Sequence, residues 1–136
     1  MIDCMVLGDS IAVGTHQVRP ECALVGKGGI NSRQWNKNYS GQIKPAETII
    51  ISLGTNDHSG INTFRELMAM RQNIKGKRVF WIMPPCNDKF CKPAVNDAVE
   101  IIAKNFGDTV ISTKQVQPDS IHPNRAGYKE IAQATQ

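Results

Sequence analysis

Short, continuous apolar runs alternate with longer stretches of helical periodicity along the whole chain. The two clearest runs, at residues 48–53 and 79–83, are continuous rather than alternating. Parallel strands that are covered on both faces have this pattern. Five segments are predicted to be strands: residues 2–7, 23–25, 48–53, 79–83 and 109–111.

Three of the intervening stretches place apolar residues on one helix face. Their apolar positions are Phe64, Leu67, Met68 and Ile74; Val95, Ala98, Val99, Ile102 and Phe106; and Ala126, Ile131 and Ala132. Gly76 and Gly107 are predicted to end the first two helices, and Pro93 suits the first turn of the second. Alternation of strands and helices predicts an α/β fold with three layers and a mostly parallel sheet.

The bulk properties indicate one small globular domain. A chain of 136 residues has room for a single domain, residues 1–136, with one proper core. No apolar run is long enough to span a membrane, and no signal stretch precedes the first predicted strand. We therefore expect a cytoplasmic protein, although release by a phage or by lysis would leave no trace in the sequence. The net charge of +4 is dispersed and no nucleic-acid motif is present, so we expect no nucleic-acid partner.

The four cysteines fall into two pairs with different surroundings. Cys4 lies in a predicted strand and Cys22 directly precedes one, and a cysteine there usually serves as a small buried hydrophobe. Cys86 and Cys91 flank a polar loop, and the sequence leaves open whether they pair or hold a metal. No zinc spacing accompanies them. In a cytoplasmic protein we expect reduced thiols.

Polar or glycine-rich segments follow the predicted strands, at the sheet edge where such folds bind ligands. Gly8-Asp9-Ser10-Ile11 follows the first strand. It places Ser10 at a helix start, where free N–H groups and the helix dipole favour a developing negative charge. The alternative is that Ser10 merely caps the helix.

Two further segments carry hydrogen-bond donors suited to an oxyanion. The glycines of residues 26–31 permit a close approach of the backbone to a ligand. The alternative is that the segment is only a turn. In Gly54-Thr55-Asn56-Asp57, the Asn56 amide is a possible oxyanion donor. The alternative is that Asn56 or Asp57 caps the next helix.

The segment Asp119-Ser120-Ile121-His122-Pro123 supplies an acid and a base near the C-terminus. A carboxylate three residues before a histidine can reach its ring, fix its tautomer and stabilise the imidazolium. The alternative is an exposed loop histidine. Because the first strand of a doubly wound sheet commonly lies between the second and third, Ser10, the glycines and Asn56 are expected to converge. The return of His122 to Ser10 does not follow from this order, since the fifth strand lies at the far edge.

These four blocks, in this order, resemble the SGNH hydrolases, also called GDSL-type esterases. Ser10 corresponds to the nucleophile, and Asp119 and His122 to the acid and base of the triad. Gly29 and Asn56 correspond, with the N–H of Ser10, to the oxyanion hole; Gly29 is preferred to Gly28 because an apolar residue follows it. The resemblance implies a flavodoxin-like five-stranded parallel sheet in the order 2-1-3-4-5, with neither a metal nor an organic cofactor.

The resemblance also implies an esterase that forms an acyl-enzyme on Ser10. Because the chain is short for the family, we expect an open site for short acyl groups, such as O-acetyl groups on a carbohydrate, in a monomer. The alternatives are a catalytically idle binding or structural module on the same scaffold, for example in a phage particle, and a lysophospholipase or thioesterase. His58 and Trp35 are candidates to touch substrate, with an exposed histidine and a core tryptophan as the simpler interpretations.

Overall fold

A five-stranded parallel sheet forms the centre of the computed structural model, which describes residues 1–136. The strands are β1 (Ile2–Gly8), β2 (Ala23–Gly26), β3 (Ala46–Ser52), β4 (Gly76–Ile82) and β5 (Thr109–Ile111). They lie in the order β2-β1-β3-β4-β5, and every neighbouring pair is parallel. The structure confirms the predicted α/β class and strand order, and each predicted strand overlaps an observed one.

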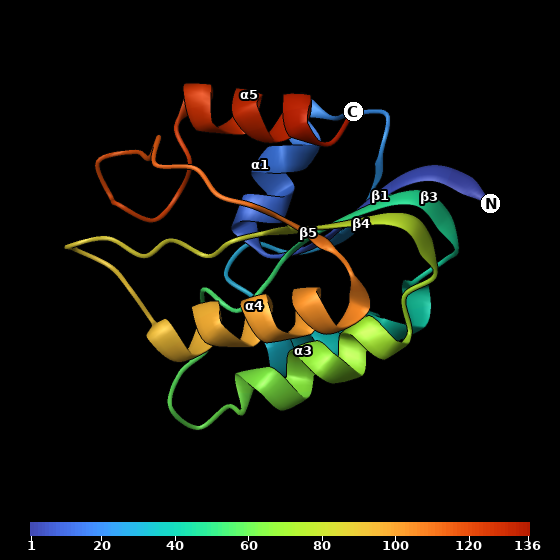
Figure 1. Cartoon of the computed structure of the whole chain (residues 1–136), viewed down its shortest axis with the longest axis horizontal. Helices are drawn as coiled ribbons and strands as arrows, with labels where there is room; N and C mark the ends of the chain where they lie inside the picture. Colours follow the sequence, from blue (N-terminus) through green and yellow to red (C-terminus); the bar gives the residue numbers. More distant parts are fainter.

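Helices cover both faces of the sheet and complete the three layers. They are α1 (Ser10–Val18), α2 (Ser32–Tyr39), α3 (Thr63–Gln72), α4 (Pro93–Phe106) and α5 (Arg125–Ala134), with a 3₁₀ turn, η1 (Ser40–Gln42), after α2. Figure 1 shows α1 and α5 on one side of the sheet and α3 and α4 on the other. None of these helices combines the length and the apolar composition needed to cross a bilayer.

The continuous hydrophobicity of β3 follows from this two-sided covering. Ile49 and Ile51 belong to the core under α2, α3 and α4, whereas Ile50 belongs to the second core under α1 and α5. All three side chains are fully buried. Trp35 of α2 is also fully buried, and its Nε1 donates to the carbonyl oxygen of Val25 at 3.0 Å. Trp35 is therefore a core residue and not a stacking platform for a sugar.

Two predicted features of the helices need correction. Gly76 does not end α3; the C-cap is Asn73, and Gly76 begins β4, three residues earlier than predicted. Phe64 and Phe106 are about 40% exposed although they share the helical spacing of buried neighbours. By contrast, Pro93 begins α4 and Gly107 ends it in the left-handed conformation, as predicted.

The expectation of free, reduced thiols is wrong, because all four cysteines form disulfides, Cys4–Cys22 and Cys86–Cys91. Cys4 lies in β1 and Cys22 immediately precedes the adjacent strand β2, so their Cα atoms are only 4.5 Å apart. The sequence pattern indicated correctly that both are buried but not that they are neighbours. Disulfides are typical of oxidising compartments.

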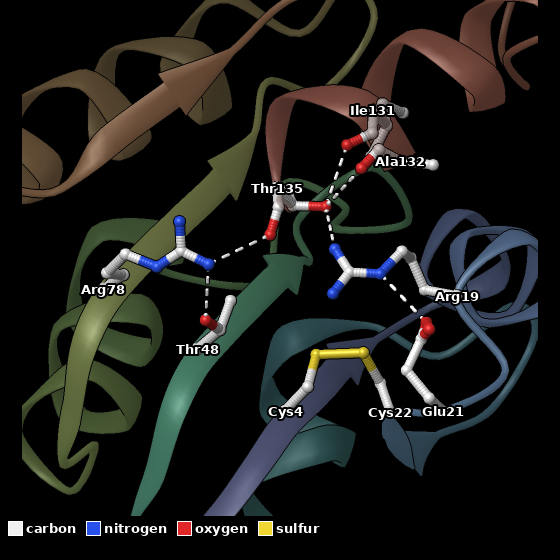
Figure 2. A network of polar contacts seen from close by, with 9 residues as sticks. All are labelled: Cys4, Arg19, Glu21, Cys22, Thr48, Arg78, Ile131, Ala132 and Thr135. Carbon is white, nitrogen blue, oxygen red and sulfur yellow. Dashed lines mark hydrogen bonds and ion pairs between the residues drawn. A yellow bond between two sulfur atoms is a disulfide. The ribbon is translucent and has the colours of Figure 1, made fainter.

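The C-terminal helix is fixed at its far end by a polar network (Figure 2). Arg19 donates to Thr135 Oγ1 at 2.6 Å, and Arg78 donates to Thr48 Oγ1 at 2.9 Å and to the Thr135 carbonyl oxygen at 3.3 Å. Thr48 and Arg78 lie in the first half of their strands. The end of α5 is thereby held near the amino ends of the strands, so its beginning points toward their carboxyl ends.

Candidate active site

The carboxyl ends of the three adjacent strands β2, β1 and β3 approach one another unusually closely. Gly8 pairs with Gly26 on one side and with Ser52 on the other. A Cβ on Gly8 would lie 1.7 Å from the Ser52 carbonyl oxygen, and one on Gly26 would lie 2.0 Å from the Gly8 oxygen. Gly8 also has a φ of +139°, which favours glycine. Glycine at these positions lets the segment carrying Asp9 and the next residues leave the sheet beside β3.

Asp9, not Ser10, is the N-cap of α1. Its Oδ1 accepts hydrogen bonds from the Ile11 N–H at 3.0 Å and from Ser52 Oγ at 3.1 Å. The interpretation of Ser10 as a mere cap is therefore wrong, and its hydroxyl points elsewhere. Complete burial raises the pKa of Asp9 to about 6, and its Oδ2 has no hydrogen-bond partner.

Ser10, His122 and Asp119 form one hydrogen-bonded chain. Ser10 Oγ lies 2.8 Å from His122 Nε2, and His122 Nδ1 lies 2.6 Å from Asp119 Oδ2. Because Nδ1 faces a carboxylate, it carries the proton and Nε2 is left to accept from the serine. This is the order of nucleophile, base and orienting acid that acyl transfer requires.

The turn that carries the acid and the base is held by hydrogen bonds from its own backbone to the Asp119 side chain. Asp119 Oδ1 accepts from the N–H groups of Ile121 and His122 at 2.9 and 3.0 Å, and Ser120 has a φ of +61°. The Ile121 N–H, followed by the His122 side chain, lowers the pKa of Asp119 to about 2. The carboxylate therefore stays ionised at neutral pH, although its side chain is 42% exposed.

The segment between β5 and α5 brings this turn back to Ser10, which is the step that the sequence did not supply. Within the segment, the Gln117 N–H donates to the His122 oxygen at 2.8 Å, and the Asn124 N–H donates to the Gln115 oxygen at 2.9 Å. Helix α5 then packs against α1, which begins at Ser10. His122 reaches the nucleophile because these two helices share one face of the sheet.

The predicted oxyanion donors lie on two connected turns. Asn56 Nδ2 donates to the Ile30 oxygen at 3.1 Å, which leaves the amide one further hydrogen for a ligand. Gly29 has a φ of +78°, and a Cβ on the preceding Gly28 would lie 3.8 Å from the Ser10 Cβ. The glycine turn thus lies beside the nucleophile. The oxyanion-hole assignment of Gly29 and Asn56 stays a prediction.

Asp57 has a structural role that the sequence analysis missed. It does not cap α3, whose N-cap is Asn62, and neither does Asn56. Instead its buried carboxylate accepts from the Ser32 N–H at 2.8 Å, Ser32 Oγ at 2.6 Å and Thr63 Oγ1 at 2.7 Å. Asp57 therefore ties the turn of Asn56 to the start of α2. In the sequence, an aspartate in a polar turn before a helix has the pattern of an N-cap. Only the fold shows that Asp57 is buried and which groups it accepts from.

His58 is an exposed residue that makes a local contact. Its Nδ1 accepts from the N–H of Gly60 at 3.1 Å. This agrees with the simpler interpretation of His58 in the sequence.

The fold has known counterparts among solved structures. Neither models of protein families nor the sequences of curated proteins match the chain. A member of the lipolytic protein G-D-S-L family from Veillonella parvula matches 98% of this chain and 95% of its own, with 18% identity and a TM-score of 0.70. The catalytic domain of peptidoglycan O-acetyltransferase A from Streptococcus pneumoniae matches 97% and 89%, with 19% identity and a TM-score of 0.68.

A catalytic mutant of an acetylxylan esterase from Geobacillus stearothermophilus also matches, over 98% of this chain and 91% of its own, with 18% identity and a TM-score of 0.61. At these identities the likeness establishes the fold. The chain therefore has the fold of the SGNH hydrolases, in agreement with the resemblance of its four sequence blocks.

Proposed function

We propose that the protein is a serine esterase that cleaves carboxylic esters through an acyl-enzyme on Ser10. The observation that carries the proposal is the hydrogen-bonded chain from Ser10 through His122 to Asp119. The same arrangement also argues against an idle module, because binding alone gives no reason to align a hydroxyl, an imidazole and a carboxylate.

In the proposed reaction, each step is assigned to a group of this chain. His122 Nε2 takes the Ser10 proton as Oγ attacks the ester carbonyl, and the oxyanion is held by the N–H groups of Ser10 and Gly29 and by the Asn56 amide. Collapse of the intermediate expels the alcohol, which receives the proton from His122. A water molecule, deprotonated in turn by His122, then attacks the acyl group, releases the acid and restores Ser10.

We further propose that the substrate is a short acyl group, such as acetyl, on a carbohydrate. An open hollow of about 240 Å³ lies at the glycine turn next to Ser10. Its lining has one hydrophobic residue among six: Lys27, Gly28, Gly29, Ile30, Gln34 and Asn38. Amides and an ammonium suit sugar hydroxyls better than an acyl chain of a lipid. Two structural counterparts are an acetylxylan esterase and a peptidoglycan O-acetyltransferase, and the disulfides agree with a substrate outside the reducing cytoplasm.

Hydrolysis of p-nitrophenyl esters from acetate to palmitate, by wild type and by Ser10→Ala, tests the proposal. We expect turnover of the short esters that disappears in the variant, and release of acetate from acetylated xylan or peptidoglycan. Cleavage of only long-chain esters would contradict the carbohydrate assignment and favour a lysophospholipase or thioesterase. If no ester were turned over in a Ser10-dependent manner, the catalytically idle binding module would be the better interpretation.

A further inference from the structure

The loop that follows β4 is closed on itself by the Cys86–Cys91 disulfide. Inside it, the Asn87 N–H donates to the Phe90 oxygen at 2.8 Å, and Asn87 Oδ1 accepts from the N–H groups of Lys89 and Phe90 at 2.9 and 3.0 Å. Figure 1 shows this loop and the segment between β5 and α5 extending from the same side of the molecule. We call residues 86–92 the disulfide loop; none of its residues belongs to the four sequence blocks.

The disulfide loop contacts the turn of Asn56 through Lys92. Lys92 Nζ donates to the carbonyl oxygens of Thr55 and Asp57, both at 2.8 Å. These are the two residues on either side of Asn56. Lys92 forms no ion pair with a carboxylate, so these backbone oxygens are the partners that hold its ammonium. Both carbonyls of the turn therefore point toward Lys92. These two hydrogen bonds restrain the peptide planes on either side of Asn56, from which its side chain projects.

The same loop contacts the turn that carries the base. Asn87 Nδ2 donates to the Ser120 oxygen at 2.9 Å. Ser120 lies between Asp119 and His122 and has the left-handed φ on which the turn depends. One loop therefore bridges the turn of the candidate oxyanion donor and the turn of the candidate base.

The position of Lys92 is unfavourable for its own helix. Lys92 is the N-cap of α4, but its side chain makes no capping hydrogen bond. Ser, Thr, Asp and Asn are the residues that stabilise an N-cap, and the helix dipole disfavours a cation at the amino end. Local rules of this kind are broken most often where a site needs the residue. The two contacts around Asn56 supply such a need.

We propose that the disulfide loop is a positioning element of the active site, in which Lys92 orients Asn56 for the oxyanion and Asn87 steadies the turn of His122. The inference rests on the proposed esterase function. An oxyanion donor is effective only when it is held in place before charge develops. A small displacement of such a group can cost about 100-fold in rate. Lys92 acts through Asn56 and need not touch the substrate.

The test compares Lys92→Met, which keeps the stem but removes the donors, with Lys92→Arg and with Lys89→Met. Lys89 is an exposed lysine of the same loop and serves as the matched control. With p-nitrophenyl acetate, we expect Lys92→Met to lower kcat about 10- to 100-fold with little change in KM. Complete removal of an oxyanion donor costs about 10²–10³-fold, and misplacing the donor should cost less than that. Lys92→Arg should recover part of the loss, and Lys89→Met should match wild type.

A double-mutant cycle with Asn56→Ala separates positioning from general damage. If Lys92 acts through Asn56, Lys92→Met should cost almost nothing in the Asn56→Ala background. An equal loss in both backgrounds would overturn the proposal, as would wild-type kcat in Lys92→Met. If Lys92→Met does not fold, Cys86→Ser/Cys91→Ser opens the loop with Lys92 intact. Its loss of kcat should be smaller in the Asn56→Ala background but should not vanish there, because the loop also contacts the turn of His122 through Asn87.

The two proposals fail in different ways. Absence of Ser10-dependent turnover in wild type would overturn both the esterase function and the role of the loop. Turnover that depends on Ser10 and Asn56 but not on Lys92 or the disulfide would overturn only the role of the loop.

Discussion

Reduction of the Cys4–Cys22 disulfide should destabilise the protein by an amount that follows from its place in the chain. The bond joins residues separated by 18 positions and links β1 to the start of β2. The loop-entropy relation gives about 3 kcal/mol at 25 °C for a closed loop of this length. Both cysteines are buried, and reduction leaves their side chains in place. The difference in unfolding free energy between the oxidised and reduced forms therefore reports the cross-link and not a loss of packing.

The measurement is urea unfolding of Cys86→Ala/Cys91→Ala, in which Cys4–Cys22 is the only remaining bond, with and without a reductant. The reduced form should unfold at a midpoint about 1–3 M urea lower, given m values of about 1–3 kcal/mol/M. A variant with all four cysteines replaced by alanine should not respond to the reductant. Free thiols in the protein as isolated, or a difference below about 1 kcal/mol, would refute the reasoning.

Three further changes test the acid, the buried carboxyl and the strand ends. Asp119→Asn should lower kcat by up to about 10⁴-fold, because His122 then adopts the wrong tautomer; steady-state ester hydrolysis checks this, and a loss below about 10-fold would contradict it. Because the pKa of Asp9 is raised to about 6 in the folded protein, folding binds a proton, and the contribution of Asp9 to stability grows as pH falls from 6 to 3.8. Its limit is about 3 kcal/mol, and a carbon NMR titration of Asp9 with a midpoint near 4 would refute the assignment. Gly8→Ala should lower the unfolding free energy by at least about 3 kcal/mol or prevent folding, since its Cβ would overlap the backbone of β3. Gly41→Ala, where a Cβ meets nothing within 4 Å, is the control in thermal melting.

The hydrophobic pattern was sufficient to predict the five strands, whereas their order came from the resemblance to the SGNH hydrolases. In β3 the consecutive isoleucines Ile49 and Ile50 enter opposite cores, so apolar residues follow one another there without alternation. The pattern was less informative where contacts between distant segments decide the outcome. It could not pair Cys4 with Cys22. It also assigned Gly76 to a helix end, because glycine is compatible with both the end of a helix and the start of a strand and the pattern does not distinguish the two.

The side chains of the site were predictable to the extent that strand order places them. Ser10 and the turn of Asn56 follow adjacent strands, and the structure brings the glycine turn to both. Lys92 carries no such signal, because a lysine between a cysteine and a proline looks like any solvated loop residue. Its relation to Asn56 appears only when the loop after β4 is folded over the loop after β3.

His122 shows why chain connectivity cannot replace packing. Strands lie about 4.8 Å apart, so three steps from β5 to β1 cover about 14 Å. The residues from the end of β5 to His122 can span roughly 35 Å when extended. The connection is therefore long enough to place the histidine anywhere along the carboxyl edge of the sheet. Its actual position is selected by α5, whose Ile131 packs in the same core as Ile11 of α1 and whose end is fixed by Arg19 and Arg78. The geometry of the candidate triad, just before the start of α5, thus depends on apolar and polar contacts made along the rest of the helix.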